Sequence, residues 1–453
     1  MFKTINKKNL SVKLSIYKNN LALKKIFTAS SQSAINKIIG IVFDFILSIV
    51  LARLLGVDEY GFYTYAVTVV TATATLSTFG YDTASLRFIP EYQVSGKWNF
   101  FKGYVYTSLI NTFVISFFAS CIFIVLGTFY FNINNSITYL LVISAPLIPL
   151  ISLSRVRQYV LRSLKHVIIS EILDIVGKPF LIVSSLFIYR MLFNTFHEAQ
   201  TAIIINLIIS IFVTISGFFI LYIKLPRQET FCTPKYAQGQ WLKVSIPIFL
   251  VSAMQLITGY SDTLMLGLLA NYTEAGVYSV AVRITSFVGF SLMAINMILA
   301  PIISELFYSG KGKELQQILT GTVRVASVVA LIISAFLIIF GKPIIWIYGD
   351  SFSDAYTPLL ILVPGQLLNV FCGSVGLIVS LTGNQNFTAI IMAFSAIINI
   401  ILNYILIPHF GMIGAAVSTS VSIGIWNISM LVFIIKRIKI QPAVFTFKNG
   451  NQT

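Results

Sequence analysis

Charged residues are scarce in this sequence. Asp, Glu, Lys and Arg make up 10% of its 453 residues, and hydrophobic residues make up 57%, whereas soluble domains carry roughly 25% charged residues. This composition excludes an ordinary soluble protein and indicates an integral membrane protein. Acidic residues are the scarcer kind, 15 against 31 basic ones. A basic excess is also typical of nucleic-acid-binding proteins, so the positions of the basic residues must decide between the two classes.

Motifs for metals, nucleotides and covalent catalysis are also missing. The three cysteines and three histidines are scattered and match no metal-ligand spacing or disulfide framework. Gly341-Lys342 and Gly312-Lys313 lack the upstream glycine and the following Ser or Thr of a phosphate-binding loop. The loops expected on the outer side of the membrane are too short for the catalytic segment that a membrane glycosyltransferase or polymerase needs. We therefore expect no metal, no cofactor and no enzyme activity.

Long apolar stretches dominate what is present. A membrane-spanning helix needs about 20 mostly apolar residues, and the sequence predicts an all-α membrane protein with about 12 such helices. Prolines and charges interrupt the fourth and fifth stretches. The stretches are centred near residues 45, 71, 116, 146, 182, 212, 257, 288, 334, 370, 397 and 424.

Basic residues alternate between the connecting loops. With the amino terminus placed in the cytoplasm, the inner segments hold 26 of the 31 basic residues, and the four outer loops with clear boundaries hold none. This pattern follows the positive-inside rule and predicts that both termini are cytoplasmic. The basic excess is therefore explained by topology, and no nucleic acid is expected. Residues 1–33 resemble no cleaved signal peptide and are expected to form a basic cytoplasmic tail against anionic lipids.

One stretch occurs twice. LARLLGVDEYGFYTYAV (51–67) aligns with LGLLANYTEAGVYSVAV (266–282), so that Glu59 coincides with Glu274 and Gly61 with Gly276. Each copy is an apolar run, a polar turn and a second apolar run, which is typical of a transmembrane hairpin.

Because the two hairpins have the same orientation, they predict two parallel six-helix halves, an arrangement found in transporters. The expected order is the tail 1–33, a first bundle 34–223, a cytoplasmic linker 224–243, a second bundle 244–436 and a cytoplasmic tail 437–453.

Five ionisable residues lie inside the predicted spans or at their outer ends, namely Asp44, Arg53, Lys178, Asp262 and Arg283. Such residues cost about 2.5–3.5 kcal/mol each on insertion scales, so they usually face a partner or a cavity. Asp262 and Arg283 lie at the same depth, roughly 13 Å from the outer turn of the second hairpin, which predicts that they pair. For all five, a structural role and contact with a substrate remain open.

Two of these residues have a simple structural explanation. Lys178 follows Asp174 by four residues, so a local ion pair on one helix face accounts for it. Arg53 is close enough to the outer edge of its span to reach the lipid headgroups by snorkelling.

Two longer segments carry a family resemblance. The region SIVLARLLGVDEYGFYTYA (48–66) with TFGYDTASLRFIPEY (78–92), and the region IINIILNYILIPHFGMIGAAVSTSVS (397–422), resemble the polysaccharide transporters. That family shares a superfamily with multidrug and toxic-compound exporters and with peptidoglycan-lipid flippases. The resemblance covers the whole chain beyond the basic tail and implies two six-helix bundles that face each other in a V around a central cavity.

The resemblance also implies a function. Polysaccharide transporters flip undecaprenyl-diphosphate-linked oligosaccharides across the cytoplasmic (inner) membrane by alternating access, for O-antigen, capsule or exopolysaccharide synthesis. The implied partners are this lipid-linked oligosaccharide, membrane lipids, a polysaccharide polymerase and a chain-length regulator. The alternative is an ion-coupled exporter of drugs or cations, which is expected to have an acid-dominated cavity. Here Arg283 and Lys178 balance Asp262 and Asp44, which favours the flippase.

Overall fold

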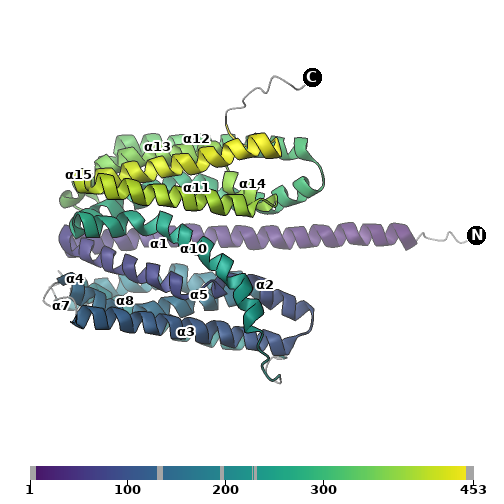
Figure 1. Cartoon of the computed structure of the whole chain (residues 1–453), viewed down its shortest axis with the longest axis horizontal. Helices are drawn as coiled ribbons and strands as arrows, with labels where there is room; N and C mark the ends of the chain where they lie inside the picture. The colour runs from purple at the N-terminus through teal and green to yellow at the C-terminus, as the bar shows by residue number, and fades with distance from the viewer. Residues whose placement is uncertain (1–6, 130–135, 194–197, 227, 229–231, 445–453) are drawn as a thin grey trace, which may run out of the picture.

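The computed structural model describes residues 7–129, 136–193, 198–226, 228 and 232–444, and these residues contain helices and no strand. Two helical bundles lie side by side (Figure 1). The first bundle, the N-lobe, contains α1 (Lys7–Ser77), α2 (Tyr81–Val94), α3 (Trp98–Phe129), α4 (Ser136–Ser144), α5 (Leu147–Ser163), α6 (Val167–Glu171), the π-helical turn η1 (Ile172–Gly177), α7 (Lys178–Phe193) and α8 (Ala199–Lys224). The second, the C-lobe, contains α10 (Gln238–Leu269), α11 (Tyr272–Tyr308), α12 (Gly312–Trp346), the short turn η2 (Asp350–Ala355), α13 (Tyr356–Cys372), α14 (Val375–Leu381), α15 (Gln385–Phe433) and the π-helical turn η3 (Ile434–Ile438).

Two of the helices, α1 and α15, are hairpins. Their backbones leave the helical conformation at Gly56 (φ 76°) and Gly411 (φ 53°), a region of positive φ that favours glycine. Asp44 and Thr71 line one cavity, although a straight helix would separate them by about 40 Å. The two arms of α1 are therefore antiparallel, as the repeat predicted. Those of α15 are antiparallel as well, since Ser395 Oγ of the first arm donates to the Ser422 carbonyl oxygen of the second.

The hairpins affect the count of membrane spans. In the described part of the chain, nine helices are long and apolar enough to cross a membrane, or ten if the bent pair α4 and α5 is one span. Each hairpin counts once in these numbers. The all-α membrane fold is confirmed, and the number of 12 spans stays a prediction.

The proline-containing fourth and fifth spans are irregular, as expected. The break before α5, at Ala145-Pro146, bends the chain by 40° between α4 and α5. The fifth span passes through η1 immediately before Lys178-Pro179. Because α5 is helical to Ser163, Arg155 and Arg157 belong to a helix of the bundle.

The start of α10 packs against the N-lobe, although most of this helix belongs to the C-lobe (Figure 1). Trp241 is fully buried, donates its indole N–H to Tyr92 Oη at 2.8 Å, and meets the Tyr104 ring edge-on. The helix also passes so close to α2 that a Cβ on Gly80 would lie 2.4 Å from the Ser245 carbonyl oxygen. The connection between the lobes is thus held by packing, and the predicted boundaries of the domains stay predictions.

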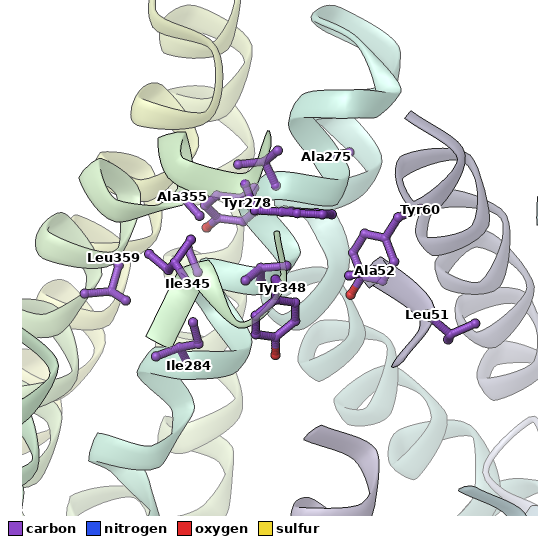
Figure 2. Close-up of a cluster of buried hydrophobic side chains, with 14 of the residues drawn as sticks. Leu51, Ala52, Tyr60, Ala275, Tyr278, Ile284, Ile345, Tyr348, Ala355 and Leu359 are labelled. Carbon is purple, nitrogen blue, oxygen red and sulfur yellow. The ribbon is translucent and has the colours of Figure 1, made fainter. Parts of the chain in front are cut away.

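The two lobes meet at the turns of the two hairpins that the sequence repeat marks, the first within α1 and the second between α10 and α11. We call this contact the hairpin junction, formed by Asp58 and Gly61 of α1 with Thr273 and Gly276 of α11. The glycine backbones are so close that a Cβ on Gly276 would lie 2.6 Å from Gly61 Cα, and Thr273 Oγ1 donates to the Asp58 carboxylate at 2.7 Å. Figure 2 shows the buried side chains beside it, including Tyr60 from α1 and Tyr278 from α11.

Candidate functional site

The largest concentration of charge between the lobes surrounds a cavity of about 390 Å³, the ionic cavity. Asp44 and Arg283 line it from α1 and α11, and Asp174 and Lys178 line it from η1 and α7. Arg283 crosses from the C-lobe, and its Nη1 donates to the Asp44 carboxylate at 2.5 Å and to the Asp44 carbonyl oxygen at 2.8 Å. No bond is formed by Nε or Nη2 of Arg283 within the described residues, so these donors are available to a ligand.

The predicted pairing of Arg283 with Asp262 is wrong. Asp262 lies on the face of α10 that packs against α15, whereas Arg283 lies on the face of α11 that packs against α1. Equal depth in the membrane placed the two residues at one level, but it did not fix the direction in which each helix presents its side chain.

Asp262 instead lies in a neutral polar shell within the C-lobe. Its carboxylate accepts hydrogen bonds from Tyr278 Oη at 2.6 Å, Asn403 Nδ2 at 2.7 Å, Asn399 Nδ2 at 3.2 Å and Thr419 Oγ1. It lines a cavity of about 350 Å³, the Asp262 cavity, whose lining contains no Lys, Arg or His. The Asn403 side-chain oxygen beside it is buried without a partner in the described structure. One carboxylate among amide and hydroxyl oxygens suits a proton or a monovalent cation better than Ca²⁺ or Mg²⁺, which need more oxygen ligands of higher charge.

The local ion pair predicted between Lys178 and Asp174 is not formed, because Asp174 pairs with another residue. The carboxylate of Asp174 forms an ion pair with Arg157, whose side chain is 1% exposed. Gly217 of α8 makes room for that guanidinium, because a Cβ there would overlap it. Within the described residues the Lys178 ammonium forms no ion pair and no hydrogen bond, and it lines the ionic cavity.

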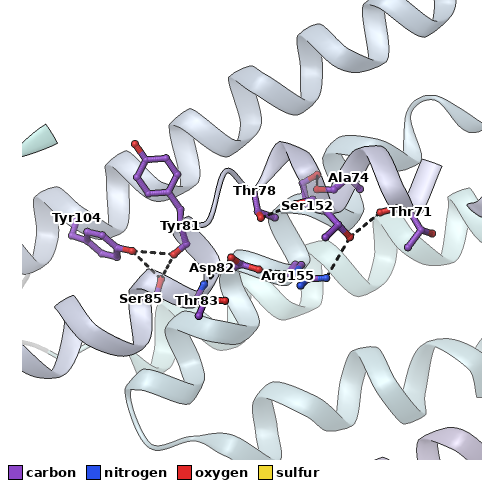
Figure 3. Close-up of polar contacts among 11 residues, drawn as sticks. Thr71, Ala74, Thr78, Tyr81, Asp82, Thr83, Ser85, Tyr104, Ser152 and Arg155 are labelled. Atoms are coloured by element: carbon purple, nitrogen blue, oxygen red, sulfur yellow. Dashed lines mark hydrogen bonds and ion pairs between the residues drawn. The ribbon is translucent and has the colours of Figure 1, made fainter. Parts of the chain in front are cut away.

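A further ion pair joins α5 to α2 within the N-lobe. Arg155 Nε donates to the Asp82 carboxylate at 2.7 Å (Figure 3). Arg155 also lines a smaller cavity of about 240 Å³ that shares Asp174 and Lys178 with the ionic cavity. Around these two adjoining cavities, four cations face three carboxylates, and the cation in excess is Lys178. The cations are Arg155, Arg157, Lys178 and Arg283, and the carboxylates are Asp44, Asp82 and Asp174.

Arg53 belongs to the hairpin end of the molecule and lines none of these cavities. Its guanidinium donates to the Trp346 and Ile347 carbonyl oxygens, both at 2.6 Å, and lies 5.7 Å from the centre of the Trp346 ring. A cation at these last carbonyl groups stabilises the end of α12. Arg53 therefore links α1 to the C-lobe, which a simple snorkelling role did not anticipate.

The sequence interpretation missed the shell of Asp262 and the ion pairs of Arg155 and Arg157. The shell had a signal, since Asn399 and Asn403 lie one helical turn apart in the segment that carries the resemblance. The two arginines had a weaker signal. They follow the prolines of the fourth span, and these prolines made the start of α5 hard to locate in the sequence. Among the described residues, no group of three or more His, Cys, Asp or Glu side chains is placed to hold a metal ion.

Comparison with known proteins identifies relatives. Residues 22–307 match the model of the family described as polysaccharide biosynthesis protein, and residues 247–405 match the MatE family. "Probable flippase AglR" of Haloferax volcanii is 30% identical over 188 residues, which cover 40% of this chain and 39% of that protein. "Probable low-salt glycan biosynthesis flippase Agl15" of the same organism is 25% identical over 181 residues, 38% of each chain. The matches thus span about two fifths of the length of these relatives.

Solved structures share the fold over almost the whole chain. A multidrug resistance MATE transporter of the MOP superfamily in an inward-facing conformation matches with a TM-score of 0.76 and 14% identity, covering 90% of this chain and 98% of that one. The lipid II flippase MurJ in an inward closed conformation matches with a TM-score of 0.68 and 17% identity, covering 91% and 88%. These matches confirm the exporter fold that the resemblance implied. The family model that matches more than half of the sequence places this multi-pass membrane protein in the polysaccharide biosynthesis protein family.

Proposed function

We propose that this protein is a flippase that moves lipid-diphosphate-linked oligosaccharides across the cytoplasmic membrane by alternating access. The observation that carries the proposal is the ionic cavity between the lobes, where Lys178 is the cation in excess and Arg283 keeps unused donors. A diphosphate-sugar headgroup cannot cross hydrocarbon without a polar path, because the desolvation of its charges costs too much.

The two cations differ in what they offer a diphosphate. The guanidinium of Arg283 has a planar set of donors that matches two phosphate oxygens at once, while the ammonium of Lys178 is a compact point charge. Arg283 comes from the C-lobe and Lys178 from the N-lobe. A diphosphate bound between them would therefore couple headgroup binding to the relative position of the lobes.

The hairpin junction supports a mechanism in which the lobes close at one end. In this structure the lobes touch at Gly61 and Gly276, on the hairpin side of the ionic cavity. We infer that this side faces outward and that both termini are cytoplasmic, so that the headgroup enters from the cytoplasm. Opening of the junction would then release it outside, and Asp262 would exchange a proton or a monovalent cation during the cycle.

The wider biological role follows from the family. AglR and Agl15 are named probable flippases, which is consistent with a transporter rather than an enzyme. We propose surface polysaccharide synthesis as the process, O-antigen, capsule or exopolysaccharide, with a polymerase and a chain-length regulator acting on the flipped product.

An exporter of organic cations is the second candidate. One observation favours it, namely the Asp262 cavity, in which an acid is present and no base lines the wall. The match of residues 247–405 to the MatE family covers part of this cavity.

The experiment that separates the two candidates uses Lys178→Met and Lys178→Arg in the full-length protein. Transport of a lipid-linked oligosaccharide is measured in proteoliposomes, together with efflux of a fluorescent organic cation. For a flippase, Lys178→Met should abolish oligosaccharide transport and Lys178→Arg should retain part of it. A gain of cation efflux in Lys178→Met, with no oligosaccharide transport by the wild type, would support the exporter instead.

A further inference from the structure

A third cavity, the neutral groove, lies in the C-lobe among α11, the α13–α14 connection and the second arm of α15. Its volume is about 440 Å³, which is within the range of small-molecule sites. None of the residues that line it is ionisable. Its polar groups are amides, hydroxyls and the indole of Trp426.

Three polar atoms of this groove have no hydrogen-bond partner in the described structure. They are the side-chain oxygens of Asn296, Ser374 and Asn427. Ser374 and Asn427 are only 2% and 1% exposed. Buried polar atoms without partners are rare in native proteins because their desolvation is not compensated. Seven other side-chain atoms of this kind are spread over the rest of the described structure, so the gathering of three around one cavity is what favours a polar occupant.

Trp426 provides a flat surface in the same groove. A Cβ on Gly376 would lie 3.0 Å from its indole ring, so a glycine at that position leaves the ring its space. Within the described residues, neither the indole N–H nor the side-chain amide of Asn369 forms a hydrogen bond. An aromatic face with amides and hydroxyls around it is complementary to a sugar ring, which has an apolar face and hydroxyl groups at its edge.

The groove is continuous with the Asp262 cavity. Asn369, Trp426 and Asn427 line both, and Gln366 extends the row of amides towards Asp262. An occupant longer than a single sugar ring therefore has room along this path.

The two lobes differ at equivalent positions. Glu59 accepts a hydrogen bond from the backbone N–H of Ala199, and the matching Glu274 accepts one from that of Met412, 213 residues further on. The same shift places Trp426 and Asn427 where the N-lobe has Val213 and Thr214. Val213 and Thr214 line the small N-lobe cavity with Arg155, Asp174 and Lys178. One lobe is thus ionic where the other is neutral and rich in amides.

We infer that the neutral groove is a binding site for the uncharged glycan of the substrate, while the ionic cavity holds its diphosphate. This inference rests on the proposed flippase function. It assigns the two chemical parts of one substrate to the two lobes and makes Ser374, Trp426 and Asn427 glycan-binding residues.

The test uses two probes with the full-length protein in phosphatidylglycerol nanodiscs, which contain no sugar. One probe is undecaprenyl diphosphate, which has no glycan. The other is the free glycan released by mild acid from the lipid-linked oligosaccharides of the producing cells. Ser374→Ala and Asn427→Leu should weaken glycan binding about fivefold or more, as expected for the loss of one hydrogen bond. Neither should change the binding of undecaprenyl diphosphate. Lys178→Met should weaken the binding of undecaprenyl diphosphate and leave glycan binding unchanged.

Ser327→Ala is the matched control, because Ser327 is also buried in the C-lobe without a partner and does not line the groove. Glycan binding by Ser374→Ala and Asn427→Leu at the level of Ser327→Ala would overturn the inference. So would a wild type that binds undecaprenyl diphosphate and not the glycan, and the proposed function would survive that result. A wild type that binds neither probe would instead refute the proposed function itself.

Discussion

Replacement of Gly276 by alanine should prevent the hairpin junction from closing. The added Cβ would lie 2.6 Å from Gly61 Cα and 2.9 Å from Gly61 N. Both obstacles are backbone atoms, so no side chain can rotate away. Overpacking of this kind typically costs 1–3 kcal/mol, and here the cost applies only to the state in which the lobes touch. The closed junction should therefore lose population by about 5- to 150-fold relative to the open one.

The closed state can be measured by crosslinking. Thr273 Oγ1 and the Asp58 carboxylate are 2.7 Å apart, so cysteines at these two positions should be joined by a short bifunctional thiol crosslinker when the junction closes. Gly276→Ala should slow this reaction at least fivefold and lower transport by a similar factor. Its thermal stability should change little, because the open state relieves the overlap.

Gly312→Ala is the control for this experiment. Gly312 is also helical, and a Cβ there would meet nothing within 4 Å. The reasoning would be refuted by a Gly276→Ala protein that crosslinks and transports like Gly312→Ala. A Gly276→Ala protein that fails to fold would be distinguished by its elution in gel filtration, and Gly61→Ala would then provide the second measurement.

Three further predictions concern the ionic residues and the topology. Arg283→Ala should lower oligosaccharide transport at subsaturating substrate by about tenfold or more, the value of a charge-assisted hydrogen bond. Arg283→Lys should retain part of it, and full activity of the alanine variant would exclude contact with the substrate. Asp262→Asn should remove the dependence of transport on pH or on a cation gradient, and an unchanged dependence would rule out coupling at this site. It should also lower stability by about 1–3 kcal/mol, because an amide nitrogen would face hydroxyl and amide donors. Cysteines at Asn271 and Asp350 should react with an impermeant thiol reagent in intact cells, and protection of both would contradict the predicted topology.

The sequence alone predicted the hairpins well because the repeat marks their turns. Gly56 aligns with Asn271, and the structure turns at both positions, through a positive φ at Gly56 and an amino-terminal cap at Asn271. The acid three residues later also proved informative. Glu59 and Glu274 each accept a backbone hydrogen bond at the start of a helix of their own lobe.

The partner of Arg283 could not be predicted from depth alone. Because α11 begins at Tyr272, directly after its cap Asn271, Arg283 lies twelve residues from the turn and about 18 Å from it, deeper than the 13 Å expected from the sequence. Asp44 likewise lies twelve residues before Gly56, whereas Asp262 lies only nine residues before Asn271. Asp44 thus matched the depth of Arg283 better than Asp262 did. What remained unknown was the rotation of each helix about its axis, since each residue turns the side chain by about 100°.

The neutral groove had no sequence signal of comparable strength. Asn296, Ser374 and Asn427 come from three separated segments, and each is a common residue with no spacing that relates it to the others. Only the packing of α11, α13 and α15 brings them to one cavity. Their lack of partners is a property of the folded structure, and composition cannot reveal it.

The contact of Gly61 with Gly276 also has a consequence for the origin of the protein. Equivalent residues that meet each other are the mark of a self-complementary interface in a two-fold symmetric homodimer. A single ancestral bundle with this glycine would have associated with a second copy through the same surface. Fusion of the two genes would keep that interface while freeing each copy to change its interior. Such a fusion permits one lobe to become ionic and the other to become lined with amides. A homodimer cannot diverge in this way, because one gene encodes both of its subunits.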